Sequence, residues 1–559
     1  CTMFYRKLTK KNGKTYHYIL KSVYDKKKRC SVHKQVSDLT KLPNEIIEAV
    51  KSILTGKKVI LTLKEKKIIK IQSTRFFGPL WIAYHFWEGL GLHKVNLTKQ
   101  EYDNLTALVI GRTVSPTIEC RSELKTAEYL NRTALSQIFG KNNYSWDRNN
   151  FYPILTKLTE NWDKVEEELW NQRKQVPRLY LYDITSSYFE GKGGSFGALG
   201  YSRDEKRGNP QIVIALVSDE KGIPIAIRIL PGNTKDSTTV KDTISDLKSK
   251  YMAERAIMIM DRGMQSEANI DFIKENGFDF VMALKHKEGR EFLKKHNPDL
   301  EWTLFDNRKI AQWEEDGKRY IICRNPEAAK RDNKTRTAII ERGKNRLEKL
   351  KESVIKGRIK NKEKILARAV KILTQTKTEK YFTYEVGESS FSYTQSKTVE
   401  WDEMYEGCYV LETTLDNTVS KEEIDSNYRN QHEIEEIFKS CKSELNIRPN
   451  FHKKDENIFG HIYLTFLSHL VKRTIELKLK ENGCNEKGSF VLNKFSDITL
   501  NQVVVNSESE LVVTELDAER RKLANMLEIN IPTGQLSRTL CRYTSKCFHP
   551  IRNQHIAKK

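Results

Sequence analysis

Residues 178–285 constrain the fold of this chain more than any other stretch. The segment 219–222, DEKG, is a hairpin signal between two apolar runs. Polar stretches with helical periodicity separate the later apolar runs. In chain order the segments are apolar runs at 178–184, 212–218 and 223–230, a helix at 237–250, an apolar run at 256–260, a helix at 266–276 and an apolar run at 278–284. This order predicts an α/β fold with a mixed sheet flanked by helices.

The N-terminal third of the chain has a different pattern of residues. Residues 1–60 alternate aromatic and basic side chains, which is typical of short strands, and Asn44 to Leu54 has the pattern of a short helix. Such a ribbon suits either contact with a phosphate backbone or a plain solvated surface. Residues 75–172 are mainly helical, and the segment 127–139, AEYLNRTALSQIF, resembles two short helices joined by a turn. A helix-turn-helix that reads DNA is one interpretation, and a small helical packing domain is the more frequent one.

Residues 286–420 interrupt the strand and helix alternation. Strand-like runs at 302–304, 319–323, 381–385 and 409–414 surround a long helical stretch. From Lys330 to Lys380 the chain has 18 Lys or Arg and 6 Asp or Glu, a net charge of +12 that is more than half of the +23 of the whole chain. A helix with this excess is a candidate for contact with a phosphate backbone, and the alternative is an ordinary solvated helix.

Charge and cysteine content narrow the class of protein. A formal net charge of +23 over 559 residues favours a polyanionic partner, nucleic acid first, although a lysine-rich proteome also explains it. Nine scattered cysteines without a C-x-x-C pair indicate reduced thiols in a cytosol, and Cys541, Cys547 and His549 make only a weak zinc pattern. No signal segment is visible, and the most apolar run, 458–471, is too short and too polar to span a membrane. The first residue is cysteine, which leaves open whether the natural start is included.

Three acidic residues are the candidates for chemistry. Asp183 and Asp261 each end an apolar strand, and an acid in that position costs free energy unless it is paired, hydrogen-bonded or metal-bound. Taken singly, each is more often a turn or helix cap. Tyr428, Gln431, Glu435 and Lys442 are spaced by three, four and seven residues, which places them on one face of an α-helix.

If that helix packs beside the sheet edge, Glu435 completes a group of three carboxylates with Asp183 and Asp261. Carboxylates this close repel one another unless cations lie among them. Mg²⁺ prefers hard oxygen ligands, and two such ions would hold the attacking and leaving oxygens of a phosphodiester displacement. The sequence therefore predicts a site for two Mg²⁺ ions, with Mn²⁺ able to substitute.

Several motifs resemble those of DDE transposases from bacterial insertion sequences. YDITSSYFEG at 182–191 resembles the first-acid motif, and MDRGMQS at 260–266 resembles the second. PGNTKDSTT at 231–239 and GHIYLTFLSHL at 460–470 resemble the family's G-N-T-x-D loop and the helix after the glutamate. Tyr428, Glu435 and Lys442 match the Y-(2)-R-(3)-E-(6)-K signature of the insertion-sequence-four-like family, with Gln431 in place of its arginine.

This resemblance, which covers roughly 178–475 and extends to the subgroup with a long N-terminal region, implies a ribonuclease H-like fold with a β-rich insertion before the glutamate. It implies a transposase that binds terminal inverted repeats, cleaves the element's ends and joins 3′-hydroxyls to target DNA, acting as a homodimer in the cytoplasm, on the nucleoid of a bacterium. Some members release the element through a DNA hairpin, with an aromatic residue on a flipped base; Trp302, Trp313 and Trp401 are the tryptophans of the insertion. The expected DNA contacts are Tyr428, Arg429, Lys442, Arg262, Lys344, Arg346, Lys349 and Arg358.

The expected domains follow from these segments. They are a ribbon at 1–60 that is a candidate for DNA contact, a helical DNA-binding or packing domain at 61–175, a catalytic core at 176–285 and 421–480, the insertion at 286–420, and a C-terminal region at 481–559. Two alternatives remain open: a ribonuclease H-like nuclease that cuts without joining, and a DNA-binding derivative that has lost catalysis.

Overall fold

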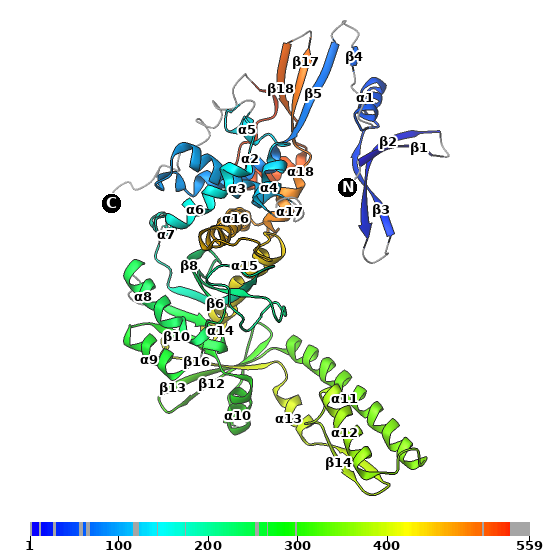
Figure 1. Cartoon of the computed structure of the whole chain (residues 1–559), viewed down its shortest axis with the longest axis vertical. Helices are drawn as coiled ribbons and strands as arrows, with labels where there is room; N and C mark the ends of the chain where they lie inside the picture. The colour runs from blue at the N-terminus through cyan, green and yellow to red at the C-terminus, as the bar shows by residue number, and fades with distance from the viewer. Residues whose placement is uncertain are drawn as a thin grey trace. The chain divides into compact units, whose positions relative to one another are not determined.

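The computed structural model describes residues 3–10, 13–25, 30–54, 60–62, 68–115, 122–141, 144–173, 175–251, 256–264, 266–296, 299–505 and 508–536. The fold is a mixed α/β arrangement with a large mixed sheet and many helices (Figure 1). It divides into two compact units, the first made of 1–172, 441–447 and 456–559 and the second of 173–440 and 448–455. None of the helices in the described ranges is long and apolar enough to cross a membrane.

A nine-stranded mixed sheet forms the centre of the second unit. Its strand order is β11-β12-β13-β16-β10-β9-β6-β7-β8. The strands are β6 (Leu179–Tyr188), β7 (Gln211–Asp219), β8 (Pro224–Pro231), β9 (Ile257–Met260), β10 (Asp279–Ala283), β11 (Thr303–Phe305), β12 (Arg308–Glu315), β13 (Lys318–Arg324) and β16 (Cys408–Thr413). β9 runs parallel to both β6 and β10, whereas β6 with β7 and β7 with β8 are antiparallel. The strands predicted between 178 and 285 are thus confirmed.

The sequence explains why the central strands are covered on both faces. Every residue of β7, QIVIALVSD, is buried, so it lacks the alternation of a half-exposed strand. The helices α8 (Val240–Lys250), α9 (Glu267–Glu275) and α10 (His286–His296) connect or flank these strands. α8 contacts α9, α9 contacts β10, and α10 contacts β16. Each helix buries its apolar stripe, for example Val240, Ile244 and Leu247 on α8.

Residues 286–420, which the sequence predicts to be one insertion, contribute strands to the central sheet. β16 pairs with β10 on one side, Ala283 opposite Leu411, and with β13 on the other, Ile321 opposite Leu411. Four strands of this range therefore extend the central sheet, because the apolar side chains of β13 and β16 are buried only when they continue the surface of β10. β12 is an additional strand that the sequence pattern does not reveal.

Residues 326–407 leave the sheet and form a helical hairpin with a small two-stranded sheet. The hairpin consists of α11 (Pro326–Ile355) and α12 (Lys362–Thr376), which lie side by side, followed by β14 (Phe382–Val386), β15 (Phe391–Gln395) and α13 (Thr398–Tyr405) (Figure 1). α11 buries Arg336, Ile340, Gly343, Leu347, Leu350 and Val354, a spacing of four and three that faces α12 and the small sheet. A Cβ at Gly343 would lie 2.8 Å from Thr378 Oγ1, so the close approach at this point depends on glycine.

The segment 428–442 is not a single helix. α14 (Lys421–Arg429) ends before Asn430, and α15 (Gln431–Ser443) begins after it. Ser420 caps α14 by accepting a hydrogen bond of 3.1 Å from the Glu423 N–H. Asn430 keeps right-handed helical angles, and its backbone N–H bonds back to Asn427 and Tyr428. Tyr428 therefore belongs to a different helix from Gln431, Glu435 and Lys442.

The first unit combines a β-ribbon, a helical body and a second sheet. The ribbon β1-β2-β3 (Met3–Thr9, Thr15–Asp25, Cys30–Asp38) and α1 (Asn44–Leu54) confirm the strands and helix expected before residue 60. The helices are α2 (Gly78–Gly89), α3 (Lys99–Val114), α4 (Glu123–Leu130), α5 (Leu135–Ile138), α6 (Arg148–Glu160), α7 (Trp162–Asn171), α16 (Asp455–Glu481), α17 (Gly488–Lys494) and α18 (Ala518–Met526). The other sheet has the order β19-β18-β17-β5-β4, with bounds Gly534–Leu536, Glu508–Val513, Thr499–Val505, Ile68–Phe76 and Ile60–Thr62.

The geometry of 127–139 favours packing over DNA reading. α5 has only four residues, and Leu135, Ser136 and Ile138 are buried. α4 buries Thr126, Ala127, Tyr129 and Leu130. Since a recognition helix must present side chains to a groove, the short, buried α5 does not suit that role.

Candidate active site

Two aspartates lie side by side at the end of the parallel strands. In the register of β6 and β9, Leu181 lies opposite Ile259 and Tyr182 opposite Met260. Asp183 and Asp261 are the next residue of each chain, so they follow at the same level of the sheet. β9 ends at this point, whereas β6 continues as the partner of β7. The prediction that Asp183 ends its strand is wrong, because β6 extends to Tyr188, but the two acids still lie at the same level of neighbouring strands.

The surroundings of Asp183 favour its protonated form when no cation is bound. The pKa of Asp183 is raised to about 7, chiefly by burial and also by the negative charges of Asp261 and Glu435. A hydrogen bond of 2.7 Å from the Ile184 N–H and the positive charge of Arg203 act in the opposite direction. Asp261 and Glu435 are therefore close enough for their charges to act on Asp183.

Glu435 reaches this place from α15 and shares a cavity with Asp261. The cavity has a volume of about 590 Å³, and Tyr428 and Gln431 also line it. Gln431 is buried, and the ring centroid of Tyr428 lies 5.6 Å from that of Tyr409. The break at Asn430 thus leaves Tyr428, Gln431 and Glu435 on the same cavity, although they come from two helices.

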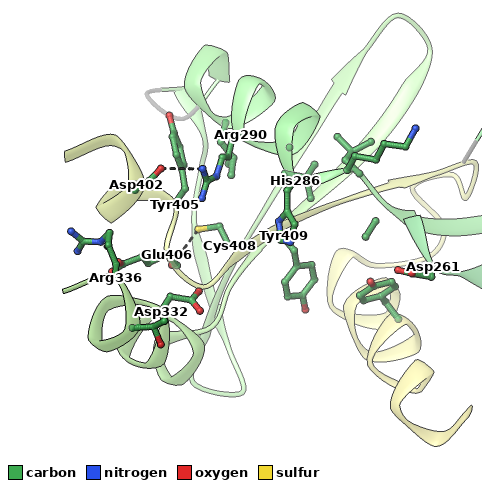
Figure 2. Close-up of a pocket in the computed structure, with 18 of the residues that line it drawn as sticks. Asp261, His286, Arg290, Asp332, Arg336, Asp402, Tyr405, Glu406, Cys408 and Tyr409 are labelled. Carbon is green, nitrogen blue, oxygen red and sulfur yellow. Dashed lines mark hydrogen bonds and ion pairs between the residues drawn. The ribbon is translucent and has the colours of Figure 1, made fainter. Parts of the chain in front are cut away.

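The far end of the cavity is built by the helical hairpin and α13 (Figure 2). Arg290 Nη1 lies 3.1 Å from Asp402 Oδ1, and Lys380 Nζ lies 2.6 Å from Asp402 Oδ2. Burial acts to raise the pKa of Asp402, but the hydrogen bonds from Lys380 and Tyr381 hold it below its usual range. No local sequence pattern marks Arg290, Lys380 and Asp402, because these residues belong to separate segments of the chain.

A second ion-pair group fixes the start of the hairpin. Arg336 Nε lies 2.6 Å from Glu406 Oε1, and Arg336 Nη2 lies 3.0 Å from Glu403 Oε1. Asp332 accepts a hydrogen bond of 3.0 Å from the Gly407 N–H. Cys408 lines the cavity beside these groups, and burial raises the pKa of its thiol to about 11, so it is a neutral wall residue at physiological pH.

Arg429, which the sequence predicts to contact DNA, forms ion pairs with two aspartates of the protein. Its Nε lies 3.1 Å from Asp425 Oδ2, and its Nη2 lies 3.3 Å from Asp306 Oδ2. The guanidinium also stacks on Phe305, with Cζ 5.8 Å from the ring centroid. Asp425 is fully buried and also accepts a hydrogen bond from the Tyr409 hydroxyl. The Arg429 guanidinium is thus already bound within the second unit, and it does not line the cavity where Gln431 lies.

The other predicted DNA contacts differ in how exposed their side chains are. Lys442 is half-buried on α15, two helical turns beyond Glu435. The side chain of Arg262 lies outside the described residues, as do Cys541, Cys547 and His549. The exposed group comprises Lys344, Arg346 and Lys349 on α11 and Arg358 in the turn before α12.

The three tryptophans expected to be candidates for base stacking differ in exposure. Trp302 and Trp313 pack against the core that contains Leu293 and Val410. Trp401 is 40% exposed, and Lys294 Nζ lies 5.0 Å from its ring centroid. Trp401 is therefore the most exposed of these three.

The donor set at the sheet edge fits a divalent cation. Asp183, Asp261 and Glu435 offer hard carboxylate oxygens and no soft ligand, which suits Mg²⁺ or Mn²⁺ better than a thiolate-preferring metal. A mixed α/β protein with such an acid group and an exposed basic hairpin has the features of an enzyme that handles phosphodiesters.

Comparison with protein families agrees with this class. Residues 174–471 match the family model described as the transposase DDE domain, and this range is more than half of the chain. The protein therefore belongs to the DDE transposase family, whose members are enzymes of DNA transposition. Membership implies metal-dependent DNA cleavage and strand transfer. Comparison with curated proteins finds no matching sequence.

Solved transposase structures resemble the chain only distantly. The piggyBac transposase synaptic complex with hairpin DNA matches with a TM-score of 0.37 and 9% identity, over 76% of this chain and 82% of that one. The Mos1 mariner paired-end complex with Mn matches with a TM-score of 0.15 and 16% identity, over 24% and 42%. The Mos1 paired-end complex with the left transposon end has a TM-score of 0.15 and 12% identity, over 28% and 53%. Because these similarities are weak, the roles of residues rest on the chain itself.

Proposed function

We propose that this protein is a transposase of the insertion-sequence-four-like group, encoded by a bacterial insertion sequence, and that it works on DNA in the bacterial cytoplasm. It binds the terminal inverted repeats of its element, cleaves the ends by hydrolysis and joins the 3′-hydroxyls to target DNA by transesterification. The observation that carries the proposal is the position of Asp183 and Asp261 at one level of neighbouring parallel strands, with the charges of Asp261 and Glu435 acting on Asp183, inside a chain that belongs to the DDE transposase family.

In this proposal the three acids hold two Mg²⁺ ions, for which Mn²⁺ can substitute. When bound, the ions would activate the attacking water or hydroxyl and offset the charge that develops on the phosphate. Asp183 must lose its proton before it can act as a ligand. Since the pKa of Asp183 is raised to about 7, cation binding becomes easier as pH rises through neutrality. The hydrogen bond from the Ile184 N–H orients the Asp183 carboxylate for this role.

The DNA contacts are assigned by position. Tyr428 lines the cavity beside Glu435 and can donate a hydrogen bond to a phosphate near the scissile bond, with Lys442 adding a positive charge. Gln431 stands where related enzymes keep an arginine, and it can offer only a neutral hydrogen bond there. Arg429 is held by Asp425 and Asp306, so its contribution to DNA contact requires those ion pairs to open.

The terminal repeats would bind to basic surfaces outside the acid group. The exposed side chains Lys344, Arg346, Lys349 and Arg358 form one such surface on the helical hairpin. The β1-β2-β3 ribbon is another candidate, because Lys10 Nζ lies 4.9 Å from the Tyr16 ring centroid and the rings of Tyr16 and Tyr18 stack 6.2 Å apart. The strands around β6, β9 and β10 would be a ribonuclease H-like core, and a homodimer would bring two ends together.

A cleavage and joining assay tests the proposal. Purified protein is mixed with a labelled duplex that ends in the element's terminal repeat, a target plasmid, and Mg²⁺ or Mn²⁺. We expect cleaved and joined products with the wild type, and neither product with Asp183→Ala, Asp261→Ala or Glu435→Ala, while duplex binding persists. Asp271→Ala, an exposed acid on α9, is the matched control and should remain active. Full activity of Glu435→Ala would remove α15 from the active site. Cleavage without joining would indicate a nuclease, and binding without cleavage by the wild type would indicate an inactive derivative.

A further inference from the structure

Asp425 is a buried acid that the proposed chemistry does not use. It lies on α14, and its side chain is fully buried. Burying a carboxylate costs free energy unless other groups satisfy its oxygens. Asp425 Oδ1 accepts a hydrogen bond from the Tyr409 hydroxyl, and Asp425 Oδ2 lies 3.1 Å from Arg429 Nε. The acid is therefore held by two specific partners, one on β16 and one on α14 itself.

A tight turn at 306–307, between β11 and β12, closes the other side of this group. Both residues of the turn have a positive φ, which lets the chain reverse within two residues. Beyond the turn, Arg308 Nη1 donates a hydrogen bond of 3.4 Å to the Tyr409 hydroxyl oxygen. Within the turn, Asp306 Oδ2 lies 3.3 Å from Arg429 Nη2. The β11-β12 hairpin thus supports both partners of the buried acid.

Tyr409 connects this group to the cavity of the candidate active site. Burial raises the pKa of the Tyr409 hydroxyl, so the hydroxyl keeps its proton and donates it to Asp425. The Tyr409 ring lines the cavity (Figure 2), as does Glu435. The Tyr428 ring, 5.6 Å away between centroids, is tilted by 36° from the Tyr409 ring. Asp425 therefore fixes the hydroxyl of a side chain whose ring supports Tyr428.

The helix break at Asn430 gives this support a role. Tyr428 lies in the last turn of α14, whereas Glu435 is on α15, so no continuous helix fixes the distance between these two side chains. Asp425 and Tyr428 are three residues apart, which makes them neighbours on the surface of α14. The contact between Asp425 and Tyr409 therefore fixes the turn of α14 that carries Tyr428.

We propose that Asp425 is a positioning residue of the candidate active site. Its contacts hold Tyr409 and the last turn of α14, and they thereby place the Tyr428 hydroxyl beside Glu435, where it donates to a DNA phosphate. The proposal rests on the transposase function proposed above and gives a role to a buried residue outside the acid group. Asp425 itself does not touch the DNA. The alternative is a buried ion pair that only stabilises α14.

The test is a double-mutant cycle on cleavage of a labelled duplex that ends in the terminal repeat, with protein in saturating excess and Mg²⁺ present. Tyr428→Phe should slow cleavage by about 10- to 150-fold, the range for loss of one hydrogen bond to a charged group. Asp425→Asn and Tyr409→Phe should each slow cleavage by up to the same factor, because both act through Tyr428. In the Tyr428→Phe background, adding either change should alter the rate by less than about twofold.

Thermal unfolding of each variant separates positioning from stability. Cleavage is compared at a temperature well below the lowest transition, where a purely structural role would leave the rate of the folded protein unchanged. Glu423→Gln, at an exposed acid on the same helix, is the matched control and should keep the wild-type rate. Should Asp425→Asn fail to fold, Tyr409→Phe carries the test, because it removes the hydroxyl and keeps the ring.

The outcomes separate this proposal from the function beneath it. Losses that multiply in the double variants would overturn the proposal, because Asp425 would then act independently of Tyr428. Wild-type rates for both Asp425→Asn and Tyr409→Phe, or for Tyr428→Phe, would overturn it as well. In each of these cases the wild type still cleaves, and the transposase function stands. If the wild type cleaves no terminal repeat, the transposase function is wrong and this proposal falls with it.

Discussion

Asp183→Asn should make the protein more stable in the absence of metal, even as it abolishes activity. The pKa of Asp183 is raised from 3.8 to about 7 in the folded protein, chiefly by burial and then by Asp261 and Glu435. The folded state therefore binds the Asp183 proton more tightly than the unfolded state does. The Asp183 proton stabilises the folded state fully below a pH of about 3.8, and this stabilisation is lost as the pH rises to about 7.

The size of the effect follows from the same shift. A difference of roughly three pH units corresponds to about 4 kcal/mol at 1.36 kcal/mol per unit, which is an upper bound because the side chain is partly exposed. Asparagine has a similar shape and cannot ionise, so Asp183→Asn should recover part of this free energy above pH 7. If half is recovered, about 2 kcal/mol, the thermal transition of the second unit should rise by roughly 4–8 °C.

The assay is thermal unfolding in EDTA between pH 4.5 and pH 8.5, followed by circular dichroism, for the wild type, Asp183→Asn and Asp271→Asn. The gap between Asp183→Asn and the wild type should widen as pH rises to about 7 and then stay level, while Asp271→Asn should follow the wild type. Adding 10 mM Mg²⁺ at pH 8 should stabilise the wild type and have much less effect on Asp183→Asn. A gap that does not depend on pH would refute the raised pKa of Asp183, and a wild type whose stability does not respond to Mg²⁺ would refute the metal site.

The remaining predictions concern the hairpin and the cavity. Replacing Lys344, Arg346 and Lys349 with Gln should lower the slope of log affinity for DNA against log salt by about 2.7, at about 0.9 per phosphate contact. The control Lys274→Gln on α9 should leave this slope unchanged. An unaltered slope for the triple variant would mean that this face of α11 is only solvated. Leu347→Ala, at a fully buried position of α11, should destabilise the hairpin by roughly 2–5 kcal/mol, measured by hydrogen exchange of 340–373. Gln431→Arg should tighten binding of the terminal repeat and steepen its salt dependence, whereas weaker binding by a folded variant would mean that the cavity wall does not meet phosphate.

Much of the second unit could be predicted from local sequence. The strands β6 to β10 are short apolar runs bounded by polar helices, so their type and order depend on neighbouring residues alone. Asp183 and Asp261 could be chosen because an acid that directly follows such a run is costly without a partner. The long helix α11 was evident from its length and its charge. In each case the signal lies within about 30 residues of sequence.

What the sequence did not reveal depends on residues that meet only after folding. β16 joins β10 across more than 120 residues, and no local pattern marks an apolar strand as part of one sheet rather than another. At Asn430 a single residue departs from helical hydrogen bonding. The periodicity of the sequence does not reveal this break, because Tyr428 and Glu435 still face one cavity. The cavity draws its walls from Asp261 and from four stretches near 283–293, 332–339, 381–410 and 428–435, and its ion pairs join residues as distant as Arg290 and Asp402.

Arg203 shows the same limit at the candidate active site. It lies in a glycine-rich stretch with four other charged residues between 203 and 207, where composition indicates only a solvated loop. Its importance arises from two long-range facts, the ion pair with Asp236 and the electrostatic effect on Asp183. Because Asp236 belongs to the loop after β8 and Asp183 to β6, the guanidinium is placed by the antiparallel β6-β7-β8 arrangement and not by its own neighbours. The acids of a site like this one can be found from strand patterns, whereas the cations that tune them become visible only once the sheet is assembled.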